Sequence, residues 1–239
     1  MKTGAIKYLL INTGNANAGT GDVGLNDTHK ICSELAVLTG VTPSSILPFS
    51  TGVTMELIPV DPIVNNLGNL IDNLNSDGWE DAALGIMTTD TVPKSATVNF
   101  TCLGETVTIS GITKGSGMIK PNMATMLSFI ATDAKIEASV LDDMLNRAVS
   151  KSFNRITVDG DTSTNDSCIL IATGKSVSLD NRELQDTFYS HLVDLMQLLA
   201  QNMVRDAEGA TKFITITVKG GASANDCLEI GRASCRERV

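Results

Sequence analysis

Helix-like and strand-like segments alternate along the whole chain, and this alternation limits the folds that the chain can adopt. The clearest segment runs from Leu184 to Met203, where apolar residues recur at spacings of three and four, as on one face of a helix. Three shorter helices are predicted from similar patterns and from capping residues, over residues 27–40, 62–74 and 140–149.

Strand-like segments lie between these helices. Short apolar runs and alternating segments predict strands over residues 8–12, 83–87, 96–109, 127–131, 156–158, 168–172 and 213–218. The third of these is divided by Leu103-Gly104-Glu105, which is typical of a hairpin. Because helices and strands mix throughout and no repeat is present, we expect an α/β fold in layers, with a sheet of mixed strand directions.

Composition narrows the classes of function. A chain of 239 residues with 42% hydrophobic content can bury a substantial core. Its net charge of -9 disfavours a nucleic-acid or anionic-membrane partner, which would require clustered Lys and Arg, and favours small-molecule ligands. No basic, apolar leader opens the chain and no run of about 18 apolar residues occurs, so we expect a cytoplasmic enzyme with no membrane span.

Two further features are interpreted as unrelated to chemistry. The five cysteines are widely spread and form no C-x-x-C pair, which predicts structural thiols and no metal site. The last stretch, residues 230–239, is Arg-rich, carries no helical or strand period and resembles a translated sequencing-adapter read. We predict that it is an artefactual tail and leave it out of the expected fold.

The segment from Lys114 to Leu127 is the most informative for chemistry. Its glycines allow close backbone approach, Pro121 stiffens the chain, and the small residue Ala124 precedes the hydroxyl of Thr125. In a strained loop that hydroxyl can attack the preceding carbonyl, and hydrolysis of the ester leaves Thr125 as a new N-terminus. Its α-amino group, with a pKa of about 8, then serves as the base for its own hydroxyl.

The residues alone leave other interpretations of this segment open. A phosphate-binding or purely structural glycine loop has the same composition. Two other patterns are set aside. Gly19-x-Gly21-x-x-Gly24 follows a strand at too great a distance for a dinucleotide fingerprint. Asp159 begins a calcium-like pattern that lacks its glycine and its final glutamate, so we expect that stretch to order a loop near the active site.

The segment 114–127 resembles the autoprocessing segment of the glutamate N-acetyltransferase family, also called the ornithine acetyltransferase family. Five other stretches are similar to blocks of that family in the same order: 12–18, 50–53, 87–91, 158–166 and 208–213. Together they span residues 5–229. The resemblance implies a layered, mixed-sheet N-terminal-nucleophile fold of the type shared by DmpA and ornithine acetyltransferase.

Carried over by position, the resemblance also implies roles for individual residues. Self-cleavage falls between Ala124 and Thr125, and Thr125 is the nucleophile. Thr51 and Gly52 form the oxyanion hole, where the loss of one donor costs about 3 kcal/mol. The residues implied to line the substrate pocket are Thr88, Lys114 and Glu208. Taken alone, the Thr51-Gly52 pair is more typical of an ordinary turn, and the two charged residues are more typical of an exposed surface pair.

The implied reaction moves the acetyl group of N2-acetylornithine to glutamate through an ester on Thr125, in arginine biosynthesis, without a cofactor. Some relatives also use acetyl-coenzyme A as donor. A heterotetramer of two α and two β chains is implied as well. Two rival hypotheses stay open: an N-terminal-nucleophile aminopeptidase or amidase that passes the acyl group to water, and a binding module that does not cleave itself and holds a phosphate or nucleotide.

The resemblance also suggests how the chain is organised. Cleavage would divide it into an α-chain part, residues 1–124, and a β-chain part, residues 125–229, followed by the tail at 230–239. Family members begin before Lys2 and continue past Glu229. We therefore expect the chain to correspond to the middle of the family's length, with sheet edges that are covered in a longer protein.

Overall fold

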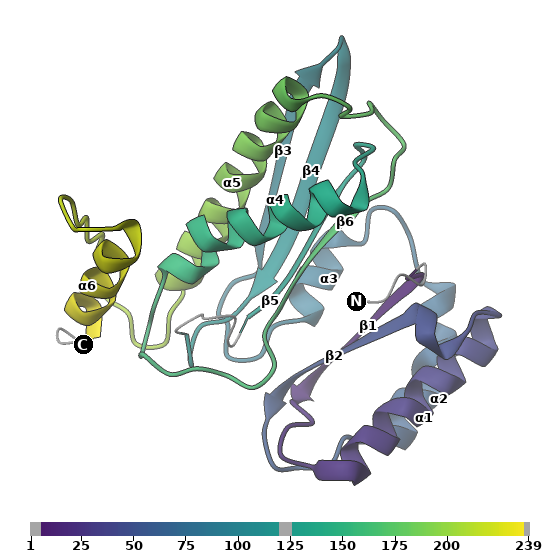
Figure 1. The fold of residues 1–239 in the computed structure, drawn as a ribbon. Coiled ribbons are helices and arrows are strands. Elements are labelled where there is room, and N and C mark those ends of the chain that lie inside the picture. The colour runs from purple at the N-terminus through teal and green to yellow at the C-terminus, as the bar shows by residue number, and fades with distance from the viewer. Residues whose placement is uncertain (1–5, 120–125, 237–239) are drawn as a thin grey trace. The chain divides into compact units, whose positions relative to one another are not determined.

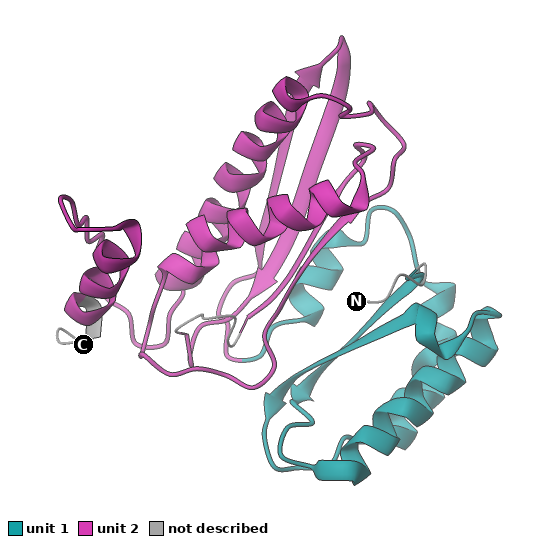
Figure 2. Ribbon diagram, viewed as in Figure 1, with its two compact units in different colours: residues 1–88 teal, residues 89–239 magenta. Residues whose placement is uncertain are grey.

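The structure is a computed structural model that describes residues 6–119 and 126–236, and it confirms the predicted mixture of helices and strands (Figure 1). The chain divides into two compact units, residues 1–88 and residues 89–239 (Figure 2). Each unit has its own sheet and its own apolar core.

Unit 1 is built on two parallel strands, β1 (Tyr8–Asn15) and β2 (Ile46–Val53). Parallel neighbours need a crossover connection, which here is helix α1 (Gly21–Thr39), followed by the short 3-10 helix η1 (Pro43–Ser45). Helix α2 (Val60–Asp72) lies beside α1 (Figure 1). These elements enclose a small core made of Cys32, Leu35, Ala36, Ile46 and Leu67.

Helix α1 differs from the prediction at its start but not at its end. It begins at Gly21, before the predicted start at residues 27–28. The hydroxyl of Thr28 donates to the carbonyl oxygen of Gly24 at 2.9 Å, so this residue lies inside the helix and does not cap it. Gly40 ends the helix as predicted, with a φ of 68° that favours glycine.

The strand predicted over residues 83–87 is wrong, because this region contains helix α3 (Trp79–Gly85). A short apolar run does not distinguish a buried strand from a short helix by its pattern alone. Glu80 and Asp81 occupy the first turn, where acidic side chains interact favourably with the positive end of the helix dipole. These two residues were the sequence signal for a helix.

Unit 2 contains a four-stranded mixed sheet in the order β3-β4-β5-β6. Strands β3 (Lys94–Cys102) and β4 (Glu105–Lys114) form the predicted hairpin. Strand β4 pairs antiparallel with β5 (Leu127–Thr132), and β5 pairs parallel with β6 (Ser167–Ala172). Both strand directions therefore occur in one sheet, as predicted.

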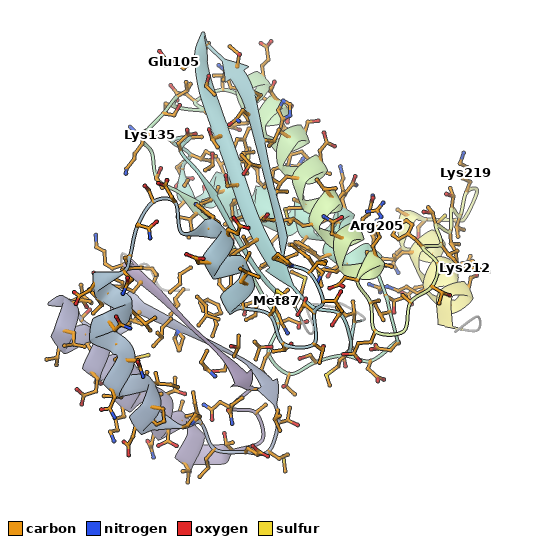
Figure 3. The ribbon with its side chains drawn as sticks, turned by 180° about the vertical axis from the view of Figure 1, so that it is seen from behind. Met87, Glu105, Lys135, Arg205, Lys212 and Lys219 are labelled. Atoms are coloured by element: carbon orange, nitrogen blue, oxygen red, sulfur yellow. The ribbon has the colours of Figure 1, made fainter. Side chains whose placement is uncertain are left out.

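Helices α4 (Ala138–Lys151) and α5 (Arg182–Arg205) pack on one face of this sheet (Figure 1). Helix α5 runs along the hairpin, from near the Glu105 end to Arg205 at the opposite end (Figure 3). Its predicted apolar stripe is confirmed, and each buried side chain of this kind contributes about 1.5–3 kcal/mol. The stripe residues that the core buries are Phe188, Leu192, Leu195, Met196, Leu199 and Met203.

Two predicted strands of unit 2 are wrong. Residues 156–158, which follow the 3-10 helix η2 (Phe153–Arg155), form no strand, and the N–H of Val158 donates to the carbonyl oxygen of Ile119 at 2.7 Å. Residues 213–218 have alternating polarity but pair with no strand of the described chain. Figure 3 shows Lys212 and Lys219, on either side of this segment, beside the C-terminal helix and away from the sheet.

The C-terminal helix is α6 (Ala224–Arg236). It includes residues 230–236, so the expectation that this stretch has no helical period is wrong. The interpretation of residues 230–239 as an artefactual tail stays a prediction.

Candidate active site

Lys114 is the last residue of β4, and it pairs with Leu127, the first residue of β5. The chain therefore leaves the sheet after Lys114 and returns to it at the directly opposed position, Leu127. Lys114 is 3% exposed, although lysine is usually a surface residue. Burial lowers the pKa of its ammonium group, while the nearby carboxylate of Asp90 opposes this change.

A buried ionic network lies next to Lys114. Lys94 Nζ lies 2.6 Å from Oδ1 of Asp90 and 2.5 Å from Oδ2 of Asp206, and the Lys94 side chain is 1% exposed. Asp90 Oδ1 also accepts the backbone N–H of Gly115 at 2.7 Å. The network therefore links the residue after Lys114 to the end of helix α5, and each of its two carboxylates accepts hydrogen bonds from Lys94 and from a backbone N–H.

Asp206 is held by more than one donor. The backbone N–H of Thr91 donates to its Oδ2 at 3.0 Å, and the Thr91 hydroxyl donates to Oδ1. Burial raises the pKa of the Asp206 carboxyl, but the hydrogen bonds from Lys94 and Thr91 outweigh burial, so that the pKa lies below its ordinary value. Asp206 is therefore an anion at neutral pH.

Glu208 also contacts this glycine-rich segment. Its backbone N–H donates to the carbonyl oxygen of Ser116 at 2.8 Å. Its carboxylate lies against Gly117, where an added Cβ would be 2.8 Å from Oε1. The hydroxyl of Ser116 is buried and lies 2.8 Å from that of Thr89. Segment 114–117 thus contains the buried Lys114 and is contacted, at Ser116 and Gly117, by the exposed Glu208.

Two carboxylates of the loop before β6 contact the described ends of the β4–β5 connection. Asp159 accepts the backbone N–H groups of Met118 and Ile119, the second at 2.9 Å. Asp166 accepts the backbone N–H of Met126. The prediction that side chains of this stretch order the loop through hydrogen bonds with the backbone is confirmed, since both carboxylates accept from backbone N–H groups.

Asp166 has an unusual electrostatic environment. Burial raises the pKa of its carboxyl from 3.8 to about 7, although the hydrogen bond from Met126 and the charge of Lys114 both lower it. Its Oδ2 is buried and has no hydrogen-bond partner among the described residues. A carboxyl in such a position is neutral in a substantial fraction of molecules near pH 7.

The predicted oxyanion-hole residues belong to unit 1. Thr51 and Gly52 lie in β2, opposite Thr13 and Gly14 of β1. Gly52 has a φ of 132°, and an added Cβ would lie 2.3 Å from the carbonyl carbon of Gly14. Only glycine fits there without moving the backbone. Thr88, at the end of unit 1, is exposed.

The predicted site residues thus fall into three groups. Unit 2 brings Lys114 and Glu208 onto one segment. Unit 1 holds the implied oxyanion-hole and pocket residues Thr51, Gly52 and Thr88. The cleavage site and nucleophile, Ala124 and Thr125, lie outside the described residues.

Sequence reasoning missed the network around Lys94. A lysine at the start of a strand-like segment, four residues after Asp90, was a weak signal for an ion pair. No local pattern indicates that Asp206, which is distant in sequence, completes it. Asp166 lay within a stretch that was predicted only to order a loop.

Three other features of the described chain do not add residues to the candidate site. Its residues 6–119 and 126–236 contain no group of three or more side chains able to hold a metal ion. They also contain no helix long and apolar enough to cross a membrane. A cavity of about 340 Å³ in unit 2 lies between α5, residues 213–218 and α6, and its lining includes neither Lys114 nor Glu208.

The chain is similar to known proteins over most of its length. A family model described as the ArgJ family matches residues 1–238. The "Arginine biosynthesis bifunctional protein ArgJ" of Pseudomonas syringae pv. tomato is 52% identical over 234 residues, which is 96% of this chain and 58% of that protein. The protein of the same name from Colwellia psychrerythraea is 50% identical, over 95% of this chain and 54% of its own length. The chain thus spans somewhat more than half of these relatives.

Solved structures are similar over smaller parts. The arginine biosynthesis bifunctional protein argJ of Bacillus halodurans has a TM-score of 0.44 and 37% identity, over 48% of this chain and 61% of that one. An L-aminopeptidase D-Ala-esterase/amidase from Ochrobactrum anthropi has a TM-score of 0.49 and 16% identity, over 77% and 66% of the two chains. The family match, which extends over nearly all residues, decides the assignment: the chain belongs to the ArgJ family.

Proposed function

We propose that the chain is part of an acetyltransferase of arginine biosynthesis, which transfers the acetyl group of N2-acetylornithine to glutamate. Membership of the ArgJ family supports this proposal, since the curated relatives are named arginine biosynthesis bifunctional proteins. The chain covers 58% of the first of these relatives, and the activity proposed is that of the whole protein.

The observation that carries the proposal is the convergence of Lys114 and Glu208 on one segment. An α-amino acid presents a carboxylate and an amino group on one carbon, and it needs a cation and an anion close together. The ammonium group of Lys114 suits the first and the carboxylate of Glu208 suits the second. Gly117 leaves room for the Glu208 carboxylate to lie at this segment.

Self-cleavage precedes the transfer in this proposal. The hydroxyl oxygen of Thr125 attacks the carbonyl carbon of Ala124, the C–N bond breaks, and the nitrogen takes up the proton that the hydroxyl loses. Water then hydrolyses the resulting ester, which leaves a carboxylate on Ala124 and a free amino group on Thr125. The chain becomes an α-chain part, 1–124, and a β-chain part that starts at residue 125.

The transfer then uses the new N-terminus twice. The amino group of Thr125 takes the hydroxyl proton while the oxygen attacks the acetyl group, and ornithine leaves as the amine. Glutamate attacks the acetyl ester next, and N-acetylglutamate leaves. The backbone N–H of Gly52 and a donor from Thr51 stabilise the negative oxygen in both steps, and Thr88 completes the substrate pocket. No cofactor is required.

Four finer assignments belong to the same proposal. Acetyl-coenzyme A is a second donor, which is supported by the word bifunctional in the names of the relatives. The whole enzyme has an N-terminal-nucleophile fold, works in the cytoplasm, and assembles as two α and two β chains.

Intact-mass spectrometry of the purified chain tests the proposal, with Thr125→Ala measured beside it. We expect two fragments from the parent, separated between Ala124 and Thr125, and one uncut chain from the variant. Acetyl transfer from N2-acetylornithine to glutamate is then assayed. A folded parent that stays uncut would favour a binding module, and a cleaved parent that passes the acetyl group only to water would favour an amidase.

A further inference from the structure

The loop before β6 contacts the β4–β5 connection on both sides of the residues where cleavage is proposed. On the first side, the carboxylate of Asp159 accepts two N–H groups of the connection, at Oδ2 from Met118 and at Oδ1 from Ile119. The carbonyl oxygen of Ile119 accepts in turn from the N–H of Val158 at 2.7 Å and from the hydroxyl of Thr157 at 3.0 Å. Ile119 is fully buried, so this end of the connection is fixed by both packing and hydrogen bonds.

On the second side, Met126 is held in the same way. Its N–H donates to Oδ1 of Asp166, and its carbonyl oxygen accepts from the N–H of Ser167 at 2.9 Å. Met126 is 4% exposed. Both ends of the connection therefore bind to one loop through a carboxylate and through backbone bonds.

Neither carboxylate is needed to build the sheet. Strands β4 and β5 pair through their own backbone groups from Ile109–Thr132 to Lys114–Leu127, and β5 pairs with β6 along its whole length. The two aspartates act beyond these ladders, on the residues that lead into and out of 120–125. What they determine is the separation and direction of the two ends of that stretch.

We propose that Asp159 and Asp166 are positioning residues for self-cleavage, which hold the backbone on either side of the scissile bond at a fixed span. The inference rests on the self-cleavage proposed above. Attack by a hydroxyl on its own preceding carbonyl requires a particular local backbone shape, and a misplacement of about 1 Å costs such a reaction on the order of a hundredfold in rate. The two aspartates anchor Ile119 and Met126, the described residues on either side of the scissile bond.

The test follows the appearance of the two fragments with time after cell-free synthesis, by intact mass. We expect Asp159→Leu and Asp166→Leu to slow cleavage by about tenfold or more, because leucine fills the space but accepts no hydrogen bond. Asp166→Asn keeps an oxygen for the Met126 N–H, so we expect its rate to stay within about threefold of the parent.

A matched control is present in the same loop. Asp161 is exposed and donates its backbone N–H to Oδ1 of Asp159 at 3.0 Å, a bond that a side-chain change does not remove. Asp161→Leu therefore makes the same chemical change without removing an anchor, and we expect it to cleave at the parental rate. Thermal unfolding of each variant in a Thr125→Ala background shows that it is folded.

The outcomes separate the two proposals. A cleaving parent with folded Asp159→Leu or Asp166→Leu variants that cleave at the parental rate would overturn the positioning role alone. An Asp166→Asn variant as slow as Asp166→Leu would also overturn it, because the charge and not the hydrogen bond would then matter. A parent that never cleaves overturns the proposed function together with this inference. If a leucine variant does not fold, serine at the same position, too short to reach the N–H groups, gives the same comparison.

Discussion

Unit 1 and unit 2 bury different kinds of polar groups. Among the described residues of unit 1, the buried polar side chains are the uncharged Asn15 and Thr51. Unit 2 buries charged side chains at one end of its sheet: Asp90, Lys94 and Lys114. Backbone shape at Gly52 therefore distinguishes unit 1, and buried charge distinguishes unit 2. Substitutions in unit 1 are expected to act through steric fit, and those in unit 2 through ionisation and ion pairing.

The largest effect is expected from Lys94→Met in unit 2. The change leaves the carboxylates of Asp90 and Asp206 buried without their shared cation. Removal of one partner of a buried ion pair costs about 3–5 kcal/mol of unfolding free energy. Urea unfolding followed by circular dichroism measures this loss.

Unit 1 offers the matched control for that substitution. Lys30 Nζ lies 3.8 Å from Oδ1 of Asp61, and both side chains are largely exposed. We expect Lys30→Met to cost less than about 1 kcal/mol, since exposed ion pairs contribute little. Equal losses from the two lysines would contradict the distinction between the units.

A steric substitution in unit 1 is expected to have the next largest effect. Gly52→Ala places a Cβ 2.3 Å from the carbonyl carbon of Gly14 and adds strain at a φ of 132°. We expect a loss of about 2–3 kcal/mol, because a backbone atom cannot move aside as a side chain can. Gly68→Ala, within α2 and with open space around the added Cβ, serves as the control and should not destabilise. A stable Gly52→Ala protein would show that β1 and β2 can separate locally.

Asp166→Asn should reveal ionisation in unit 2 as a dependence on pH. Burial raises the pKa of Asp166 to about 7, so the folded state binds a proton more tightly than the unfolded state, whose carboxyl has a pKa near 3.8. The contribution of Asp166 to stability therefore falls as the pH rises from about 3.8 to about 7, and stays low above that range. Asparagine has no charge to bury, so its contribution to stability does not fall as the pH rises, although it also loses the attraction to Lys114.

We expect the thermal midpoint of Asp166→Asn to exceed that of the parent by roughly 2–4 °C at pH 8. This shift corresponds to a gain of about 1 kcal/mol in unfolding free energy, a value reduced because the Asp166 carboxyl is partly exposed. The difference should shrink towards pH 5 and vanish near pH 4. Differential scanning calorimetry across this range measures it. A difference that grows as the pH falls would have the wrong sign and would exclude a raised pKa.

The smallest effect on stability is expected from Gly117→Ala in unit 2. The added Cβ meets only the end of the Glu208 side chain, at 2.8 Å, and that carboxylate can turn away. We expect a change below about 1 kcal/mol in unfolding free energy. If the proposed function holds, the Michaelis constant for glutamate should rise by about tenfold, since a displaced carboxylate loses a charge-assisted hydrogen bond. Steady-state kinetics with the whole enzyme provides the measurement.

Local sequence patterns predicted the elements of the fold for which the preference of the segment itself and its packing in the folded protein favour the same structure. The stripe of α5 and the β3–β4 hairpin around Gly104 are examples, because periodicity and turn residues specify them directly. Residues 213–218 have an equally clear alternation but no strand beside them in the described chain. A strand needs a partner, and alternation alone does not supply one.

The candidate site divides in a similar way. Lys114 and Glu208 were identified because they stand within stretches that resemble a family. The pairing of Lys94 with Asp206 depends on how the end of α5 meets the start of β3, which no local pattern reports. The raised pKa of Asp166 likewise results from burial that only the folded arrangement determines.

The register between β4 and β5 has a consequence for the products of self-cleavage. Six residue pairs, from Ile109–Thr132 to Lys114–Leu127, join the two strands, and the proposed break falls in the connection between them. After cleavage the same ladder would join two separate polypeptides, so that scission occurs without dissociation. Each product would carry two strands of the four-stranded sheet, β3 and β4 in one and β5 and β6 in the other, and would lack the neighbour that completes it. We therefore expect the two fragments to unfold in a single transition, and to refold together far better than either does alone.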